Sequence, residues 1–325
     1  MQKTRIIPIV LAAFLLMPFA SCSGNRVSDE SSPFAPVKIA VLNGPTGIGG
    51  VKLMDQPEKY QVSVYQSPDE ITGKIITGEV DVAAVPSNLA AVLYNKTEGQ
   101  ITNLGPIALG VLYIVQNTEG VGDVISSISD LRGKSILVAA KGSTTEYILN
   151  KLLASSGLSP DSDVTIEWYS NHTEVNAALL ANPGSVAMIP EPFVSVAVSK
   201  SEKVKTVLDL NAEWGRATGM ELPMSSLIAQ KSFAEGRPQD LEDLLSDYAA
   251  SINYVNESPN AAGLIAEKGF IPDAEIAEKA IPGCNLVMFE DRQKGFAVLK
   301  AYYEVLLEAD PKSIGGSLPD EDFYH

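Results

Sequence analysis

The chain has 325 residues, of which 45% are apolar and 20% charged. This composition excludes disordered, collagen-like and coiled-coil proteins and leaves room for about two domains. The net charge of −16 excludes nucleic-acid binding, because an acidic surface repels phosphate backbones. With only two cysteines and two histidines, we expect no disulfide framework, no metal site and no cofactor.

The first residues are typical of an export signal. A short basic start precedes an apolar run over residues 6–20, shorter than the roughly 20 residues that a membrane span needs. Small residues then lead to Cys22, which resembles a bacterial lipobox. We therefore expect a signal peptide over residues 1–21, a lipid on Cys22 and a polar tether over residues 22–36. The alternative is an ordinary secretory signal in which Cys22 is incidental.

From residue 37, short apolar runs alternate with amphipathic stretches of helix length, in two blocks of similar order and spacing. The predicted strands of the two blocks cover residues 37–42, 60–65, 80–85, 135–140, 164–168 and 185–189. Predicted helices follow at residues 44–54, 86–94, 141–156, 171–181 and 191–200. A further helix is predicted to begin at residue 67. Strands that alternate with helices across short loops predict parallel α/β sheets.

Two further apolar runs are long enough to cross between domains. They cover residues 105–115 and 222–229, and helix-rich segments follow at 239–255, 261–267, 274–280 and 291–308. We predict one lobe from residues 37–110 and 222–325, and a second lobe inserted at 115–215. The two crossing strands, near 105–115 and 222–229, would form a hinge.

Candidate binding residues follow the strands of both blocks. In open α/β sheets, ligands bind at the carboxyl ends of strands, where helix N-termini present free N–H groups. The residues found there carry hydroxyl, amide or carboxylate groups or are glycines: Gly44, Thr46, Gly47, Ser87, Asn88, Ser143, Thr144, Thr145 and Glu191, with the basic Lys141 nearby. The alternative for each is a turn or a helix cap, or for Glu191 an interaction with the helix dipole.

Aromatic side chains near these loops offer stacking surfaces for a planar ligand. They are Tyr65, Tyr113, Trp168 and Trp214, and core packing is the alternative for each. We expect no catalytic residue, because His172 has no Gly-x-Ser-x-Gly elbow to serve and neither a Walker loop nor a Gly-x-Gly-x-x-Gly fingerprint occurs.

Taken together, these features resemble the extracytoplasmic substrate-binding proteins of ABC transporters. The resemblance rests on the lipobox, Gly44-Pro-Thr-Gly47, Asp81-Val-Ala-Ala-Val-Pro86, Leu131-Arg-Gly-Lys134 and Ile189-Pro-Glu-Pro-Phe193. It covers nearly all of residues 37–325 and points to the branch with receptors for sulfonates, nitrate and the pyrimidine precursor of thiamine. It implies the type II periplasmic-binding-protein fold: two Rossmann-like α/β lobes, a two-strand hinge and a ligand in the cleft.

The resemblance also implies a function and a location. We expect a monomeric, lipid-anchored, extracytoplasmic receptor that closes around a small molecule and delivers it to a permease and its ATPase. Few cations flank the candidate loops, which favours a neutral or singly charged organic ligand. One alternative is an enzyme on the same fold, as in some menaquinone-pathway and pyrimidine-synthesis enzymes. Another is a ligand-sensing or adhesive lipoprotein that serves a different partner.

Overall fold

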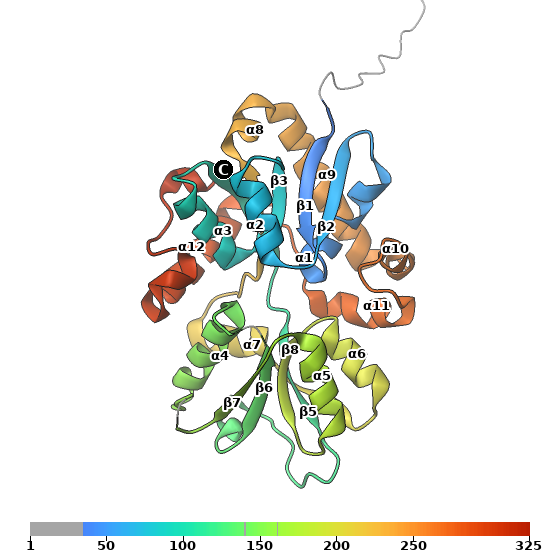
Figure 1. Ribbon diagram of the computed structural model, residues 1–325, viewed down its shortest axis with the longest axis vertical. Coiled ribbons are helices and arrows are strands. Elements are labelled where there is room, and N and C mark those ends of the chain that lie inside the picture. The colour runs from blue at the N-terminus through green and yellow to red at the C-terminus, as the bar shows by residue number, and fades with distance from the viewer. Residues whose placement is uncertain (1–34, 140, 161) are drawn as a thin grey trace, which may run out of the picture. The chain divides into compact units, whose positions relative to one another are not determined.

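Two five-stranded sheets, each covered by helices, organise the chain (Figure 1). The computed structural model describes residues 35–325 without 140 and 161, and Pro36–His325 form one compact unit. The expected signal peptide, the expected lipid-bearing Cys22 and nearly all of the expected tether lie outside the described residues. Within the described part, no helix has the length and apolar character needed to cross a membrane.

The first sheet has the strand order β2-β1-β3-β10-β4. Its strands are β1 (Val37–Leu42), β2 (Tyr60–Tyr65), β3 (Val82–Pro86), β4 (Ile101–Ala108) and β10 (Ser225–Gln230). β1 pairs in parallel with β2 and β3, whereas β10 runs antiparallel to β3 and β4. β1 and β3 are almost entirely buried, as expected for central strands that helices cover on both faces.

The second sheet repeats this plan with the order β7-β6-β8-β5-β9. Its strands are β5 (Leu112–Asn117), β6 (Ser135–Ala139), β7 (Thr165–Tyr169), β8 (Val186–Pro190) and β9 (Val204–Asp209). β6 is parallel to β7 and β8, and β5 is antiparallel to β8 and β9. The predicted parallel pairing of the strands within each block is therefore confirmed, and the antiparallel β5 and β10 make both sheets mixed. The antiparallel strands β5 and β10 are those that follow a crossing from the other sheet.

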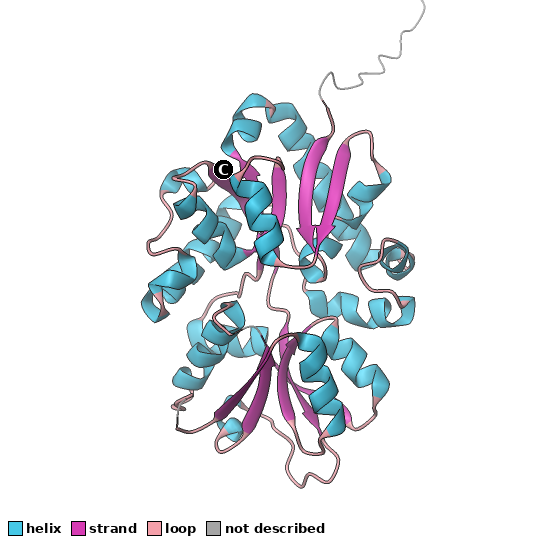
Figure 2. Cartoon of the chain, viewed as in Figure 1, coloured by secondary structure: helices cyan, strands magenta, loops and turns pink. Residues whose placement is uncertain are grey.

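Helices cover both sheets (Figure 2). With the first sheet, and forming lobe 1 with it, are α1 (Pro45–Ile48), α2 (Pro68–Ile76), α3 (Ser87–Lys96), α8 (Lys231–Gly236), α9 (Pro238–Glu257), α10 (Ala261–Glu267), α11 (Ala274–Ala280) and α12 (Arg292–Ala309). With the second sheet, forming lobe 2, are α4 (Thr144–Ser155), α5 (His172–Ala181), α6 (Phe193–Lys200) and α7 (Leu210–Thr218). Short 3₁₀ turns complete the chain: η1 (Val51–Asp55), η2 (Ile128–Leu131), η3 (Ile281–Cys284), η4 (Pro311–Ile314) and η5 (Glu321–Phe323).

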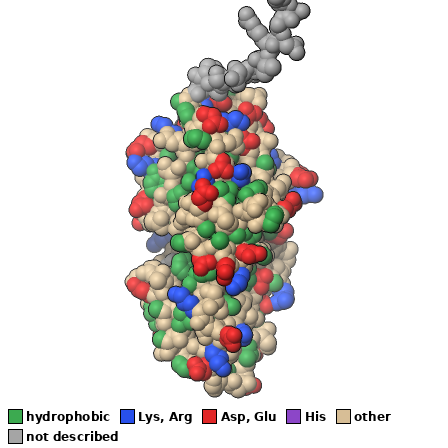
Figure 3. Space-filling model, turned by 90° about the vertical axis from the view of Figure 1, so that its right-hand side faces the viewer, with side chains coloured by type: hydrophobic (Ala, Val, Ile, Leu, Met, Phe, Trp, Pro, Cys, Tyr) green, Lys and Arg blue, Asp and Glu red, His purple; other side chains and the backbone are tan. Residues whose placement is uncertain are grey.

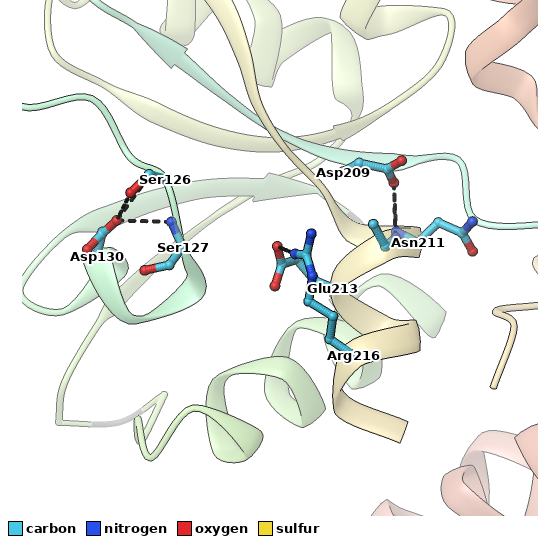
Figure 4. A network of polar contacts seen from close by, with 8 residues as sticks. Ser126, Ser127, Asp130, Asp209, Asn211, Glu213 and Arg216 are labelled. Atoms are coloured by element: carbon cyan, nitrogen blue, oxygen red, sulfur yellow. Dashed lines mark hydrogen bonds and ion pairs between the residues drawn. The ribbon is translucent and has the colours of Figure 1, made fainter. Parts of the chain in front are cut away.

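Polar side chains fix the starts of elements in lobe 2 (Figure 4). The Asp209 carboxylate accepts the N–H of Asn211 at 2.8 Å and so caps α7, whose Arg216 pairs with Glu213. Within η2, the carboxylate of Asp130 accepts hydrogen bonds of 2.9 Å from the N–H groups of Ser126 and Ser127, the two residues just before the turn. These two hydrogen bonds, together with one from the Ser126 hydroxyl, hold the pKa of Asp130 below its usual value.

The chain passes between the lobes twice, at residues 109–111 and 219–224. At the first crossing, the N–H of Gly110 donates to Asn211 Oδ1 in lobe 2 at 3.3 Å, and its carbonyl accepts from Asn285 Nδ2 in lobe 1. A Cβ on Gly110 would lie only 2.5 Å from Asn211 Cβ. The crossing thus has a tightly packed, glycine-dependent contact with lobe 2 and a hydrogen bond to lobe 1.

One hydrophobic cluster continues from lobe 1 into lobe 2 on the α12 side. Trp214 of α7 packs edge-on against Tyr302 of α12 with 6.1 Å between ring centroids, and both side chains are fully buried. Trp214 is therefore a core residue, which is the alternative that the sequence left open.

Candidate functional site

A cavity of about 680 Å³ opens where the carboxyl ends of strands from both lobes meet. Lobe 1 contributes the loops after β1 and β3 and the start of α2, and lobe 2 contributes the loops after β6 and β8 and the start of α5. Val111 of the first crossing, Leu112 directly after it and Met224 of the second crossing complete its wall. This volume is typical of small-molecule sites. We call this cavity the cleft.

Eleven residues were predicted to contact a ligand: the nine glycine, hydroxyl, amide and carboxylate candidates together with Tyr113 and Trp214. Seven of them line the cleft. They are Gly44, Thr46, Asn88, Ser143, Thr144, Thr145 and Glu191. Gly44 has a φ of 103°, a conformation that favours glycine, and a Cβ added there would meet no atom within 4 Å. The backbone at this turn is therefore open for close approach by a ligand.

The other four of these eleven residues lie outside the cleft lining, because they pack in the interior of the protein. Gly47 is buried under the loop, and the Ser87 hydroxyl pairs with Ser226 Oγ at 2.9 Å. The Tyr113 hydroxyl donates to the Gly283 carbonyl at 3.1 Å and its side chain is only 9% exposed. Trp214 is the fourth, as described above. The expectation that these residues contact a ligand therefore loses its geometric basis.

One hydrogen bond between cleft residues joins the two lobes. Thr144 Oγ1, at the start of α4 in lobe 2, donates to Asn88 Oδ1, at the start of α3 in lobe 1, at 2.6 Å. Asn88 Nδ2 donates to the Ser313 carbonyl at 3.2 Å, which fixes the orientation of its amide. Within lobe 1, the hydroxyls of Thr46 and Ser225 lie 3.0 Å apart. These groups are positioned to exchange their mutual bonds for bonds to a ligand.

The Ser143 side chain accepts the N–H of Thr145 at 3.2 Å and so caps α4. This is the capping role that the sequence left open for the loop after β6. The adjacent Thr144 makes the bond across the cleft instead. One short loop therefore both starts a helix and supplies a contact between the lobes.

Glu191 is a buried carboxyl group in the wall of the cleft, with 5% of its surface exposed. Its Oε2 accepts the N–H of Ser195 at 3.1 Å and its Oε1 accepts the Ser195 hydroxyl at 3.0 Å, so it also stabilises the start of α6. Burial outweighs these two bonds and raises the pKa of Glu191 to about 7. Near neutral pH, both its charged and its neutral forms are therefore populated.

Sequence reasoning missed five polar or aromatic side chains of the cleft: Asn43, Asp69, His172, Phe193 and Ser225. His172 begins α5 and Phe193 begins α6, and their ring centroids lie 5.1 Å apart. Burial lowers the pKa of His172 to about 4, so the ring is neutral at pH 7. An isolated histidine at a helix start carries no sequence signal for ligand binding, which explains the omission.

Few cations reach the cleft. Lys141 is the single lysine or arginine among the lining residues that the structure describes, and its Nζ lies 5.8 Å from the centroid of the Trp168 ring. Asp69 and Glu191 supply carboxyl groups. Across the described residues, no group of three or more potential metal ligands comes together. On the face seen in Figure 3, acidic and basic side chains are interspersed and no basic patch forms.

Comparisons with known proteins agree with this geometry. A family model described as menaquinone biosynthesis matches residues 51–304. A solved structure of an ABC transporter protein from Parabacteroides distasonis is 22% identical, with a TM-score of 0.75 over 90% of this chain and 99% of that one. No curated protein matches the chain in sequence.

Two further solved structures are similar in fold. The periplasmic aliphatic sulphonate-binding protein of Escherichia coli is 15% identical, with a TM-score of 0.66 over 86% of this chain and 90% of that one. The periplasmic nitrate-binding protein of Synechocystis is 13% identical, with a TM-score of 0.57 over 75% of this chain and 69% of that one. These likenesses confirm the expected α/β fold with two lobes of the periplasmic-binding-protein type.

Proposed function

The chain belongs to the family described as menaquinone biosynthesis, and from its fold and its cleft we propose that it is the solute-binding lipoprotein of an ABC importer. The observation that carries the proposal is the cleft itself: both lobes and both crossings line it, and the Thr144–Asn88 hydrogen bond bridges it. A solute held between two lobes contacts both of them only when they are closed. Its binding energy therefore favours the closed state over the open one.

The ligand that fits this cleft is a small organic molecule that is neutral or carries one charge. Lys141 alone provides a positive side chain to the cleft lining, against the carboxyl groups of Asp69 and Glu191. The sulphonate and nitrate named for the two structural relatives belong to those proteins. A doubly charged anion would meet too little positive charge here to offset its lost hydration.

The proposed partners follow from this role. The lipid on Cys22 would hold the protein at the outer side of a membrane, where it works as a monomer. A permease and its ATPase would accept the solute from the closed form. The interspersed charges in Figure 3 suit transient docking to such a partner better than binding to a polyanion.

A second candidate is an enzyme on the same fold, which the family description favours. Glu191 is the group best suited to it, because a carboxyl group with a pKa of about 7 can give and take a proton at neutral pH. The two candidates differ in one outcome. The binding protein releases its solute unchanged, whereas the enzyme converts it.

Native mass spectrometry of the purified protein tests the proposal. We expect one small organic molecule bound per chain, which leaves on mild denaturation and rebinds without change in mass. Prolonged incubation that converts this molecule into a product would favour the enzyme. A protein that neither carries nor rebinds a small molecule would contradict both candidates.

The contact between Gly283 and Glu191 offers a test of closure. A Cβ on Gly283, in lobe 1, would lie 2.9 Å from Glu191 Cγ and 3.1 Å from Tyr113 Oη, both in lobe 2. We expect Gly283→Ala to hold the lobes apart and weaken binding of the co-purified solute about tenfold. Gly263→Ala in α10 is the control, because its Cβ would meet no atom within 4 Å. Isothermal titration that gives equal affinities for the two variants would contradict closure at this contact.

A further inference from the structure

Two rings of lobe 2 form one wall of the cleft, which we call the aromatic wall: His172 and Phe193. Their centroids lie 5.1 Å apart and their planes are tilted by 43°. Asn176 Nδ2 donates to the Phe193 carbonyl at 2.9 Å and ties α5 to the start of α6. The two rings are thus held by neighbouring helices that pack on the same sheet. They present two mutually tilted aromatic rings to a ligand.

His172 adds a polar group without adding charge. Its Nδ1 atom is buried and has no hydrogen-bond partner among the described residues. The ring stays neutral at physiological pH, because burial lowers its pKa to about 4. A buried ring nitrogen left unpaired is costly, so a ligand that pairs with it gains selectivity over one that does not.

Among its charged side chains, the rest of the cleft lining has more carboxyl groups than cationic groups. Asp69 and Glu191 contribute carboxyl groups, and Lys141 is the one cationic side chain in the described lining. Lys141 also lies near the face of the Trp168 ring. An anionic ligand would therefore lose hydration without enough compensating charge, whereas an uncharged or cationic ligand would not.

We propose that His172 is a specificity residue of the cleft, which packs with Phe193 against the ring of a planar ligand that is uncharged or cationic and forms a hydrogen bond through Nδ1 with a polar group of that ligand. This inference deepens the proposed solute-binding function and rests on it. His172 and Phe193 thereby take the place of the aromatic residues that the sequence suggested for stacking. Tyr65, Tyr113, Trp168 and Trp214 are absent from the cleft lining, whereas His172 and Phe193 belong to it.

The chain contains only two histidines, His172 and His325, which makes a direct spectroscopic test possible. Protein labelled with ¹⁵N-histidine gives separate ring-nitrogen signals for the two residues. Three probes share one benzene ring and differ in charge: benzamide is neutral, benzamidinium is cationic and benzenesulfonate is anionic. Each is titrated at neutral pH into protein freed of its co-purified solute.

We expect benzamide or benzamidinium to shift the His172 signal and leave that of His325 unchanged. Benzenesulfonate should bind about tenfold more weakly than the better of these two probes. His172→Phe keeps a ring but loses the nitrogen, so it should weaken binding of that better probe about tenfold. His325→Gln is the control, because His325 is not part of the cleft lining, and it should bind that probe like the wild type.

Three outcomes would overturn the inference: tighter binding of benzenesulfonate, binding that leaves the His172 signal unmoved, or no binding of any probe at millimolar concentration. Each of these would leave solute binding intact if the co-purified molecule still rebinds. Loss of that rebinding in the wild-type protein would instead reject the proposed function. The two failures are therefore distinguishable.

Discussion

The unfolding free energy of Glu191→Gln minus that of the wild type is expected to be higher at pH 8 than at pH 4.5. The pKa of Glu191 is raised to about 7 in the folded protein from an ordinary value of 4.5. Between these values the folded state binds more protons than the unfolded state, so the wild type gains stability as pH falls. The gain amounts to roughly 3 kcal/mol and is absent in the glutamine variant.

His172 should produce the opposite trend. Its pKa is lowered to about 4 in the folded protein from an ordinary value of 6.5. Between these values the unfolded state binds more protons, so this group costs the wild type roughly 3 kcal/mol as pH falls from about 6.5 to 4. His172→Phe removes that cost, and its stability relative to the wild type should rise over the same range.

Urea unfolding at several pH values between 8 and 4 measures both trends. The differences between each variant and the wild type isolate the two groups from the many other carboxylates of this acidic protein. In the wild type, Glu191 and His172 change the unfolding free energy with pH in opposite directions, so their effects largely cancel between about pH 6.5 and 4.5. Difference curves that are flat with pH for both variants would show that neither side chain is desolvated in the cleft.

The Gly47→Ala variant is expected to lose roughly 3 kcal/mol or more of its unfolding free energy. A Cβ on Gly47 would lie 2.6 Å from Phe270 Cε1 and closer still to the carbonyl oxygen of Leu42. The clash with backbone at the end of β1 cannot be relieved by a side-chain rotation. The turn that presents Gly44 and Thr46 to the cleft would therefore be displaced.

Gly73→Ala is the matched control for this substitution. Gly73 is exposed in α2, and a Cβ there would meet no atom within 4 Å. Because alanine is the better helix former, we expect a gain of about 0.5–1 kcal/mol. Thermal or urea unfolding compares the two variants, and equal stability of Gly47→Ala and the wild type would contradict the packing described for α1.

The sequence predicts strands and helices well where buried residues form a clear apolar run or repeat. Val37–Leu42 and Val186–Pro190 are buried apolar strands next to short loops, and both were expected within a residue or two. β9 (Val204–Asp209) and α7 (Leu210–Thr218) were missed, because an edge strand with exposed lysine and threonine has no apolar run. The parallel direction of the strands within each block was predicted correctly, whereas the antiparallel pairing of β5 and β10 was not, because the sequence does not show which strand a crossing segment will join.

The candidate site was predicted at the level of loops and not of side chains. The rule that ligands bind at the carboxyl ends of strands selects the loops that carry Thr46, Asn88, Thr144 and Glu191, and all four line the cleft. The direction of each side chain depends on packing: Asn88 faces the cleft, whereas its neighbour Ser87 turns inward to Ser226. No local pattern distinguishes the two.

Small-angle X-ray scattering of the protein with and without its co-purified solute tests the closing of the two lobes most directly. The account predicts a smaller radius of gyration when the solute is bound, and a smaller change for Gly283→Ala than for Gly263→Ala. A solute that binds in titration yet leaves the radius unchanged would contradict it.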